Sequence, residues 1–145
     1  LRDQGVGYGE TPLGLERSIG KELLEPTRIY VREVLSLLER VRVKGMVNIT
    51  GGGVRNLLRL GKGVGFELDD PLEPQPVFDL ISRLGDVEER EMYQTFNMGM
   101  GFALVVGEEE AEETLRHLNG AKVVGKVTGE KGVHLPHLQA SFNSY

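Results

Sequence analysis

Three consecutive glycines follow a predicted strand in residues 48–53, which read Asn-Ile-Thr-Gly-Gly-Gly, and a short predicted helix begins directly after them. Glycines leave backbone amides unobstructed, and free amides at the start of a helix can hold an anion such as phosphate. The same residues could instead form a turn that only needs positive φ angles. Neither the G-x-G-x-x-G nor the G-x-x-x-x-G-K-[ST] fingerprint occurs, which excludes Rossmann and Walker phosphate loops.

Two further segments contain residue types that could bind a ligand. In residues 96–102, Phe-Asn-Met-Gly-Met-Gly-Phe, glycines alternate along a predicted strand. Such glycines usually allow a close approach to the sheet, by a packed helix or by a ligand. Arg28 precedes a predicted helix and could clamp a phosphate or carboxylate, although most arginines in such places are solvated or paired with a neighbouring acid.

A metal site is not expected from the histidines. His134 and His137 flank Leu135 and Pro136, but no cysteine or nearby carboxylate completes a ligand set, and the proline disfavours helical presentation. The acidic runs are Asp69-Asp70 and Glu88, Glu89 and Glu91. Runs of this kind usually form solvated faces, and no serine, histidine and aspartate constellation can be placed from the sequence.

These residues require elements that position them. Apolar residues recur at helical spacing after a plausible N-cap at Thr27. They are Val31, Val34, Leu35 and Leu38. Alternation over residues 41–49 predicts a strand with one buried face, residues 54–60 predict a short helix closed by Gly61, and residues 64–68 predict a second strand.

The second half repeats this alternation of helices and strands. A helix is expected after Pro76, with Gly85 past its end, and a more polar helix over residues 87–93. Residues 98–106 predict a strand, and residues 108–118 a helix that turns Ala111, Leu115 and Leu118 inward. Residues 122–128 predict another strand, and the tail one short edge strand around Val133.

This order of elements predicts an α+β fold, a three-layer α/β/α arrangement with a mixed sheet that is partly ferredoxin-like. Residues 1–22 contain turn formers without periodicity and are expected to be a glycine-rich leader or interdomain linker, and residues 23–145 form one domain. Because the chain opens with Leu1 instead of methionine, we expect it to be part of a longer polypeptide.

Composition excludes several classes of protein. The 145 residues carry a formal charge of −5, which provides no general attraction for nucleic acid. No apolar run is long enough for a transmembrane helix, and the first residues lack the apolar stretch of a signal peptide. Zero cysteines exclude disulfides, thiol catalysis and zinc-cysteine sites, and they suit a cytoplasmic protein.

Three segments together resemble phosphoribosylformylglycinamidine cyclo-ligases, the aminoimidazole ribonucleotide synthetases of purine biosynthesis. They are Pro26-Thr27-Arg28-Ile29-Tyr30-Val31, Ile49-Thr50-Gly51-Gly52-Gly53, and Tyr93-Gln94-Thr95-Phe96-Asn97-Met98-Gly99-Met100-Gly101. The three occur in the family's order and at its approximate spacing. The resemblance extends from about Leu23 to Thr128 and covers only the family's C-terminal domain.

The resemblance implies ATP-dependent closure of formylglycinamidine ribonucleotide to aminoimidazole ribonucleotide, in a cleft between two domains. It implies that ATP and magnesium are bound mainly by the absent N-terminal domain, with no cofactor held by this fragment, and that the full-length protein is a homodimer. The implied substrate-binding or phosphate-binding residues are Arg28, Asn48, Thr50, Gly51, Gly52, Gly53, Asn97, Gly99 and Gly101. No residue is assigned a catalytic role, and we expect no turnover by this chain alone.

One departure and two alternatives accompany this interpretation. Most members of the family carry histidine where this chain has Asn48, and asparagine cannot transfer a proton. The first alternative is a related ATP-dependent synthetase, namely selenophosphate synthetase, a hydrogenase maturation protein or formylglycinamidine synthase. The second is a non-catalytic phosphate-binding module whose glycines only shape turns.

Overall fold

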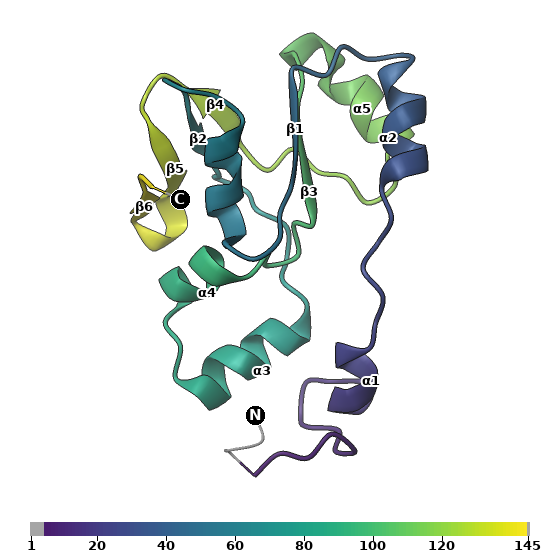
Figure 1. Ribbon diagram of the computed structural model, residues 1–145, viewed down its shortest axis with the longest axis vertical. Coiled ribbons are helices and arrows are strands. Elements are labelled where there is room, and N and C mark those ends of the chain that lie inside the picture. Colours follow the sequence, from purple (N-terminus) through teal and green to yellow (C-terminus); the bar gives the residue numbers. More distant parts are fainter. Residues whose placement is uncertain (1–4, 145) are drawn as a thin grey trace.

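The computed structural model describes residues 5–144, whose helices and strands alternate along the chain (Figure 1). The helices are α1 (Ile19–Leu23), α2 (Val31–Leu38), α3 (Pro76–Gly85), α4 (Glu89–Thr95) and α5 (Ala111–His117), with the 3-10 helices η2 (Gly53–Arg59), η3 (Glu108–Glu110) and η4 (Pro136–Leu138). The strands are β1 (Gly45–Asn48), β2 (Gly65–Glu67), β3 (Phe102–Val105), β4 (Lys126–Thr128), β5 (Gly132–Leu135) and β6 (Ala140–Phe142). Within residues 5–144, no helix has the length and apolar character needed to cross a membrane.

The strands form two sheets. β1 pairs with β3 in an antiparallel ribbon, with Met46 opposite Leu104. The other sheet has the order β4-β2-β5-β6, in which only β2 and β5 run parallel. The predicted α+β class and mixed sheet are confirmed. The chain from β1 through η2 to β2 nevertheless joins two different sheets. Helix η2 lies between the sheets and contacts both β1 and β5.

The core lies where η2 meets the strands. Val54 and Leu57 of η2 are buried against apolar side chains of both sheets and of α4. Val133 and Leu135 of β5 have 0% exposure, so the segment around Val133 is an interior strand and the prediction of an edge strand was wrong. Local hydrophobicity could not reveal this position, because it results from pairing with β2 and β6, which are remote from each other in sequence.

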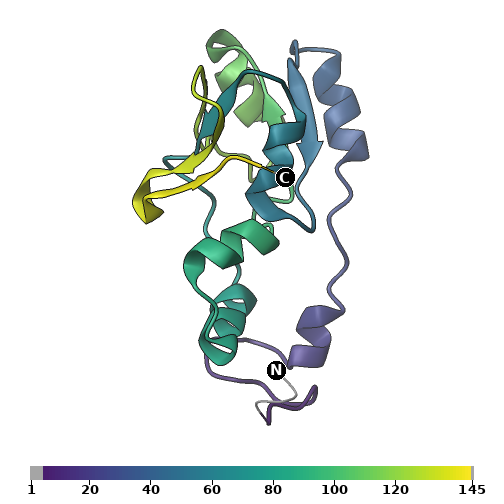
Figure 2. The ribbon, with the colours of Figure 1, turned by 60° about the vertical axis from the view of Figure 1, so that its left-hand side comes forward.

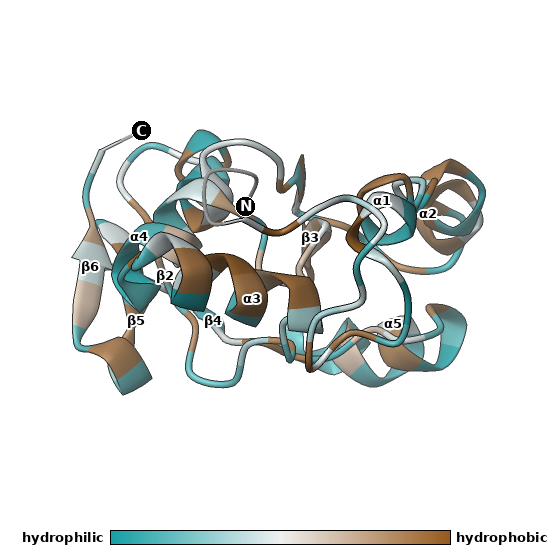
Figure 3. Ribbon diagram, turned by 90° about the horizontal axis from the view of Figure 1, so that it is seen from below, coloured by the Kyte–Doolittle hydropathy of each residue, from teal (hydrophilic) through white to brown (hydrophobic). Residues whose placement is uncertain are grey.

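Helix α2 differs from its prediction in its start and in its buried face. It begins at Val31, and the extended segment before it leaves Thr27 without the predicted N-cap role. Val34 and Leu37 are buried, whereas Val31, Leu35 and Leu38 are 60%, 59% and 42% exposed. Figure 3 shows hydrophobic bands on this peripheral helix. The predicted stripe is therefore split between the core and the surface.

Two other predicted elements are shorter or turned. The strand expected over residues 98–106 is limited to β3, because Met98 and Gly99 adopt φ angles of 46° and 87°, which no strand accommodates. The helical region after residue 108 consists of η3 and α5, in which Thr114 is buried and Leu115 is 39% exposed. The expectation that Leu115 faces inward was therefore wrong.

Part of the predicted leader is structured. Gly20 N donates to Tyr8 O at 2.8 Å and Ile19 N to Glu10 O at 2.9 Å, which brings residues 8–10 against the start of α1. The Ile19 side chain is 1% exposed. Figure 2 shows α1 separated from α2 by a long extended segment. Residues 1–4 lie outside the described part of the chain, and the boundary at residue 22 stays a prediction.

The end of α3 gives a stability prediction. The helix includes Gly85, and the residue with the left-handed conformation is Asp86, whose φ is 50°. Because a β-carbon is strained there, replacing Asp86 with glycine is expected to raise the free energy of unfolding by about 0.5–1 kcal/mol. Urea denaturation will measure it, with Asp86→Ala as a control expected to be less stable than the wild type. A lower midpoint for Asp86→Gly would contradict the prediction.

Candidate functional site

Backbone hydrogen bonds join two of the three candidate segments. Ile49 N donates to Gly101 O at 3.0 Å, and Gly52 N donates to Thr95 O at 3.3 Å. The glycine loop, which we define as residues 49–53, therefore lies beside the Asn97 turn, defined as residues 97–101. In Figure 1 both are found at the lower end of the β1–β3 ribbon. Segments almost fifty residues apart thus lie side by side at this end of the ribbon.

The amides of the glycine loop are only partly available. Gly53 N donates to Thr50 O at 3.0 Å, and Gly52 N is taken by Thr95. The prediction that the glycine amides are free is thus wrong for Gly52 and Gly53, because the loop folds back on itself before η2 begins. Asn48, Thr50 and Gly51 are exposed, and a β-carbon on Gly51 would meet nothing within 4 Å. Its surroundings are open.

Gly53 is required by packing. Its φ is 53°, and a β-carbon there would lie 2.0 Å from Tyr93 O and 2.7 Å from Phe96 O. The space is therefore filled by the end of α4, which packs on η2. This glycine supports the loop from inside and does not itself provide access for a ligand.

The Asn97 turn is closed by its own polar groups. Met100 N donates to Asn97 O at 2.9 Å, and Gly99 N donates to the Asn97 side-chain Oδ1 at 3.2 Å. A β-carbon on Gly99 would lie 2.8 Å from Glu73 O, so this glycine admits a neighbouring backbone. Positive φ at two successive central residues is typical of type I′ turns. Gly99 consequently serves this turn and not a strand.

Gly101 makes room for an aromatic side chain. A β-carbon on it would lie 2.2 Å from the Tyr30 hydroxyl oxygen. The Tyr30 ring also stacks on Phe102, with ring centroids 5.1 Å apart. The segment before α2 is therefore attached to the Asn97 turn through Tyr30, which connects the third candidate segment to the other two.

Arg28 is paired with a neighbouring acid. Its Nη2 donates to both carboxylate oxygens of Glu33, at 2.8 and 2.9 Å, and to Asn119 O at 3.0 Å. The guanidinium also lies 5.6 Å from the centroid of the Tyr30 ring. Arg28 thus holds the extended segment against α2 and the loop after α5, as the alternative interpretation of this arginine expected.

Sequence reasoning missed Asn56. This residue of η2 is 0% exposed, and its Nδ2 donates to Gly53 O at 2.7 Å, with a longer contact to Gly51 O at 3.5 Å. Arg55 Nε donates to Gly52 O at 3.3 Å. One feature of the sequence could have indicated it, because Asn56 is a polar residue between Val54 and Leu57 on the buried side of the predicted helix.

The histidines do not converge. His134 Nδ1 lies 2.9 Å from Ser141 Oγ, while the His137 ring packs edge-on against Tyr93 at 5.8 Å between centroids. Burial raises the pKa of the Tyr93 hydroxyl, and Glu89 and Glu73 raise it further, so the phenol stays neutral at physiological pH. Within residues 5–144, no three histidine or acidic side chains gather to hold a metal ion.

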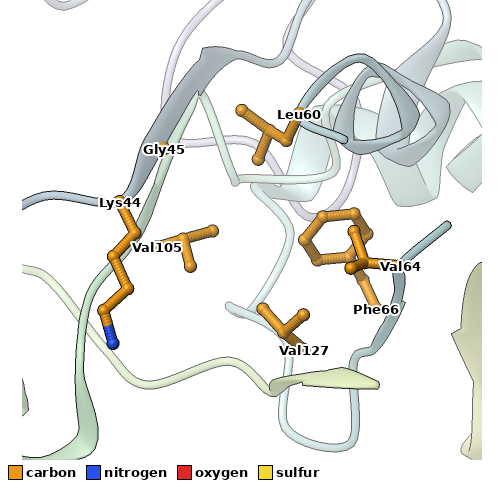
Figure 4. Close-up of a pocket in the computed structure, with 7 residues that line it drawn as sticks. All are labelled: Lys44, Gly45, Leu60, Val64, Phe66, Val105 and Val127. Carbon is orange, nitrogen blue, oxygen red and sulfur yellow. The ribbon is translucent and has the colours of Figure 1, made fainter. Parts of the chain in front are cut away.

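Two cavities lie away from these segments. One, of about 160 Å³, opens between the β1–β3 ribbon and the other sheet and is mostly apolar (Figure 4). It is lined by Lys44, Gly45, Leu60, Val64, Phe66, Val105 and Val127. The other, of about 430 Å³, lies between residues 14–17, Glu22 and Pro76. Neither is lined by a candidate binding residue.

Comparisons with known proteins identify relatives over nearly the whole chain. Residues 2–137 match the family model described as AIR synthase related protein, C-terminal domain. The phosphoribosylformylglycinamidine cyclo-ligase of Methanopyrus kandleri is 53% identical over 130 residues, which are 87% of this chain and 37% of that protein. The cyclo-ligase of Thermoplasma volcanium is 44% identical over 148 residues, 100% of this chain and 44% of that protein.

A solved structure shares the fold. The hydrogenase maturation protein HypE of E. coli aligns with a TM-score of 0.59 at 22% sequence identity, over 86% of this chain and 43% of that one. At this identity the likeness concerns the fold alone. The chain spans less than half the length of these relatives and of this structural neighbour.

The loop geometry predicts opposite results for two neighbouring glycines. Gly53→Ala should lower the free energy of unfolding by more than about 3 kcal/mol, because its β-carbon meets backbone oxygens of α4 at a strained φ. Gly51→Ala should change it by no more than about 0.5 kcal/mol, because the site is open. Chemical denaturation of both variants checks this, and equal losses would show that the loop is packed differently.

Proposed function

The chain belongs to the AIR synthase related family, C-terminal domain, and from this premise we propose that it forms one wall of a site closing formylglycinamidine ribonucleotide to aminoimidazole ribonucleotide. Two relatives that are 53% and 44% identical are phosphoribosylformylglycinamidine cyclo-ligases, which supports this reaction of purine biosynthesis. The formyl amide oxygen takes a phosphoryl group from ATP, an amidine nitrogen attacks the same carbon, and the oxygen leaves as phosphate. ADP is the other product.

The observation that carries the proposal is the hydrogen-bonded junction between the glycine loop and the Asn97 turn. Exposed Asn48, Thr50 and Gly51 can supply an amide side chain, a hydroxyl and a backbone amide to a sugar-phosphate at this junction. Their contribution is positioning and charge stabilisation, which suits chemistry between bound groups. Asn48 cannot carry a proton, so acid or base catalysis is assigned to another part of the protein.

Gly52, Gly53, Gly99 and Gly101 act in this proposal mainly by shaping the two segments around the substrate, because packing and internal hydrogen bonds occupy their surroundings. Asn97 shapes the turn in the same way. Arg28 borders the site through Tyr30 and can turn a remaining N–H group toward a phosphate while it stays paired with Glu33.

ATP and magnesium are assigned to a second domain. Residues 5–144 provide no cluster of three acidic or histidine side chains for the metal, and more than half of each relative's length lies outside the match. When bound, ATP supplies the phosphoryl group that activates the amide. The full-length protein is a cytoplasmic homodimer, and the second domain forms most of its dimer interface. This chain alone is inactive.

The second domain is expected to cover the outer stripe of α2, which consists of Val31, Leu35 and Leu38. All three are exposed, as is the neighbouring Ile29 at 80%. Exposed apolar side chains gathered on one face mark interaction surfaces. The stripe follows directly on Tyr30, which contacts Gly101, so a domain seated on it reaches the edge of the site.

The proposed reaction predicts complementation. The chain should form aminoimidazole ribonucleotide from formylglycinamidine ribonucleotide and ATP only when mixed with the part of the Methanopyrus kandleri relative outside the match. Thr50→Val should lower kcat/KM at least about tenfold, because it removes a hydroxyl at the substrate. Thr11→Val, at an exposed threonine in the segment before α1, is the control.

Product formation by the chain alone would contradict the assignment of ATP to a second domain. Turnover of a selenophosphate or hydrogenase-maturation substrate by the mixture, in place of ring closure, would favour a related synthetase. Calorimetry with ribose 5-phosphate that gives the same affinity with and without the complementary part, together with no turnover, would favour a phosphate-binding module.

The docking face gives a separate prediction. Leu35→Gln with Leu38→Gln should weaken association with the complementary part roughly 30-fold or more, because two large apolar contacts are lost. The control is Val123→Thr with Val127→Thr. These side chains are 54% and 46% exposed but lie away from α2, so this variant should leave the affinity unchanged. Calorimetric titration measures both. Equal weakening, or none in either variant, would place the second domain on another face.

A further inference from the structure

We infer that Asn56 is the positioning residue that holds the glycine loop in its binding shape, an inference that rests on the proposed function. All three glycine carbonyls receive donors from η2. Asn56 Nδ2 donates to Gly53 O at 2.7 Å and contacts Gly51 O at 3.5 Å, and Arg55 Nε donates to Gly52 O at 3.3 Å. The carbonyl groups of the loop are thus directed toward η2.

A run of three glycines needs such an external constraint. Glycine loses more conformational freedom on folding than any other residue, and it has no side chain that could fix the backbone. Gly52 and Gly53 adopt φ angles of 104° and 53°. Each glycine could adopt many other backbone conformations. The amide of Asn56 selects among these by attaching to both ends of the glycine run.

The direction of the carbonyls determines that of the amides. In a planar trans peptide unit the C=O and the following N–H point in opposite directions. With Gly51 O toward Asn56, the Gly52 amide reaches Thr95 O. With Thr50 O taken by Gly53 N, the Gly51 amide points away from the loop interior. Within residues 5–144 the Gly51 amide has no hydrogen-bond partner, and among the three glycines it is the donor that the loop offers outward.

The chemistry of Asn56 favours a role beyond stability. Its Oδ1 is buried and has no partner within the described residues. An unpaired buried acceptor is unfavourable, and an apolar side chain beside Val54 and Leu57 would avoid it. The part of the side chain with partners is the Nδ2 donor, and both of its contacts are to the glycine loop. The structure therefore assigns Asn56 to the loop.

The test compares Asn56→Asp with Val54→Ala in the 145-residue chain. Asp has the same size as asparagine but replaces the donor with an oxygen that repels both glycine carbonyls. Val54 is also 0% exposed in η2, so its truncation lowers stability without touching the loop carbonyls. The probe is ribose 5-phosphate, with ribose as the uncharged control, and the readout is the amide chemical shift of Gly51 during titration.

The wild type and Val54→Ala should show the same Gly51 shift and dissociation constants within about twofold, measured well below both melting temperatures. Asn56→Asp should bind at least about tenfold more weakly, because the loop no longer holds its amide outward. Hydrogen exchange at Gly52 and Gly53 should also be faster than in Val54→Ala. Should Asn56→Asp not fold, Asn56→Ala, which removes the donor without adding a charge, replaces it in the same comparison.

The possible failures are distinguishable. If the wild-type Gly51 amide does not respond to ribose 5-phosphate, the proposed function of the loop is wrong, and the exchange rates still test Asn56. If the wild type responds and Asn56→Asp binds equally well, the loop is a phosphate site but Asn56 does not position it. Equal effects of Asn56→Asp and Val54→Ala on affinity and exchange would reduce Asn56 to a structural residue.

Discussion

The pairing of β1 with β3 continues past both strands as the hydrogen bond from Ile49 N to Gly101 O, and the candidate site depends on it. This bond sets the distance between the glycine loop and the Asn97 turn. The contact of Gly52 N with Thr95 O then attaches the loop to the end of α4. Because three elements are joined at this junction, short strands and a short 3-10 helix are sufficient to fix the loop.

Glycine has several distinct roles around this junction. Gly53 and Gly99 allow neighbouring backbone to approach, and Gly101 accommodates Tyr30. Gly51 has open space in front of it. A high glycine content therefore reflects both glycines required by packing and glycines open to a ligand. Only the atoms around each β-carbon position distinguish the two kinds. The packing glycines bring the segments close enough for the accessible one to face the same region as Thr50.

Helix α2 illustrates a second ambiguity. An apolar residue at helical spacing indicates that a face is covered, but the spacing does not say by what. Val34 and Leu37 are covered by this chain, while Leu35 and Leu38 are exposed. The relatives are more than twice as long as the matched region, and the proposed second domain would cover this apolar face, which the folded chain leaves to solvent.

Local spacing and motif order were sufficient to predict the α+β class, most helices and the family, and they selected the candidate site residues, whose binding role stays a prediction. They could not assign β5 to the interior, divide the strands between two sheets, or show that Gly52 and Gly53 use their amides internally. Those features arise from hydrogen bonds between segments distant in the chain. The role of Asn56 belongs with them, because a buried amide acquires its meaning only from the carbonyl groups that surround it in the folded state.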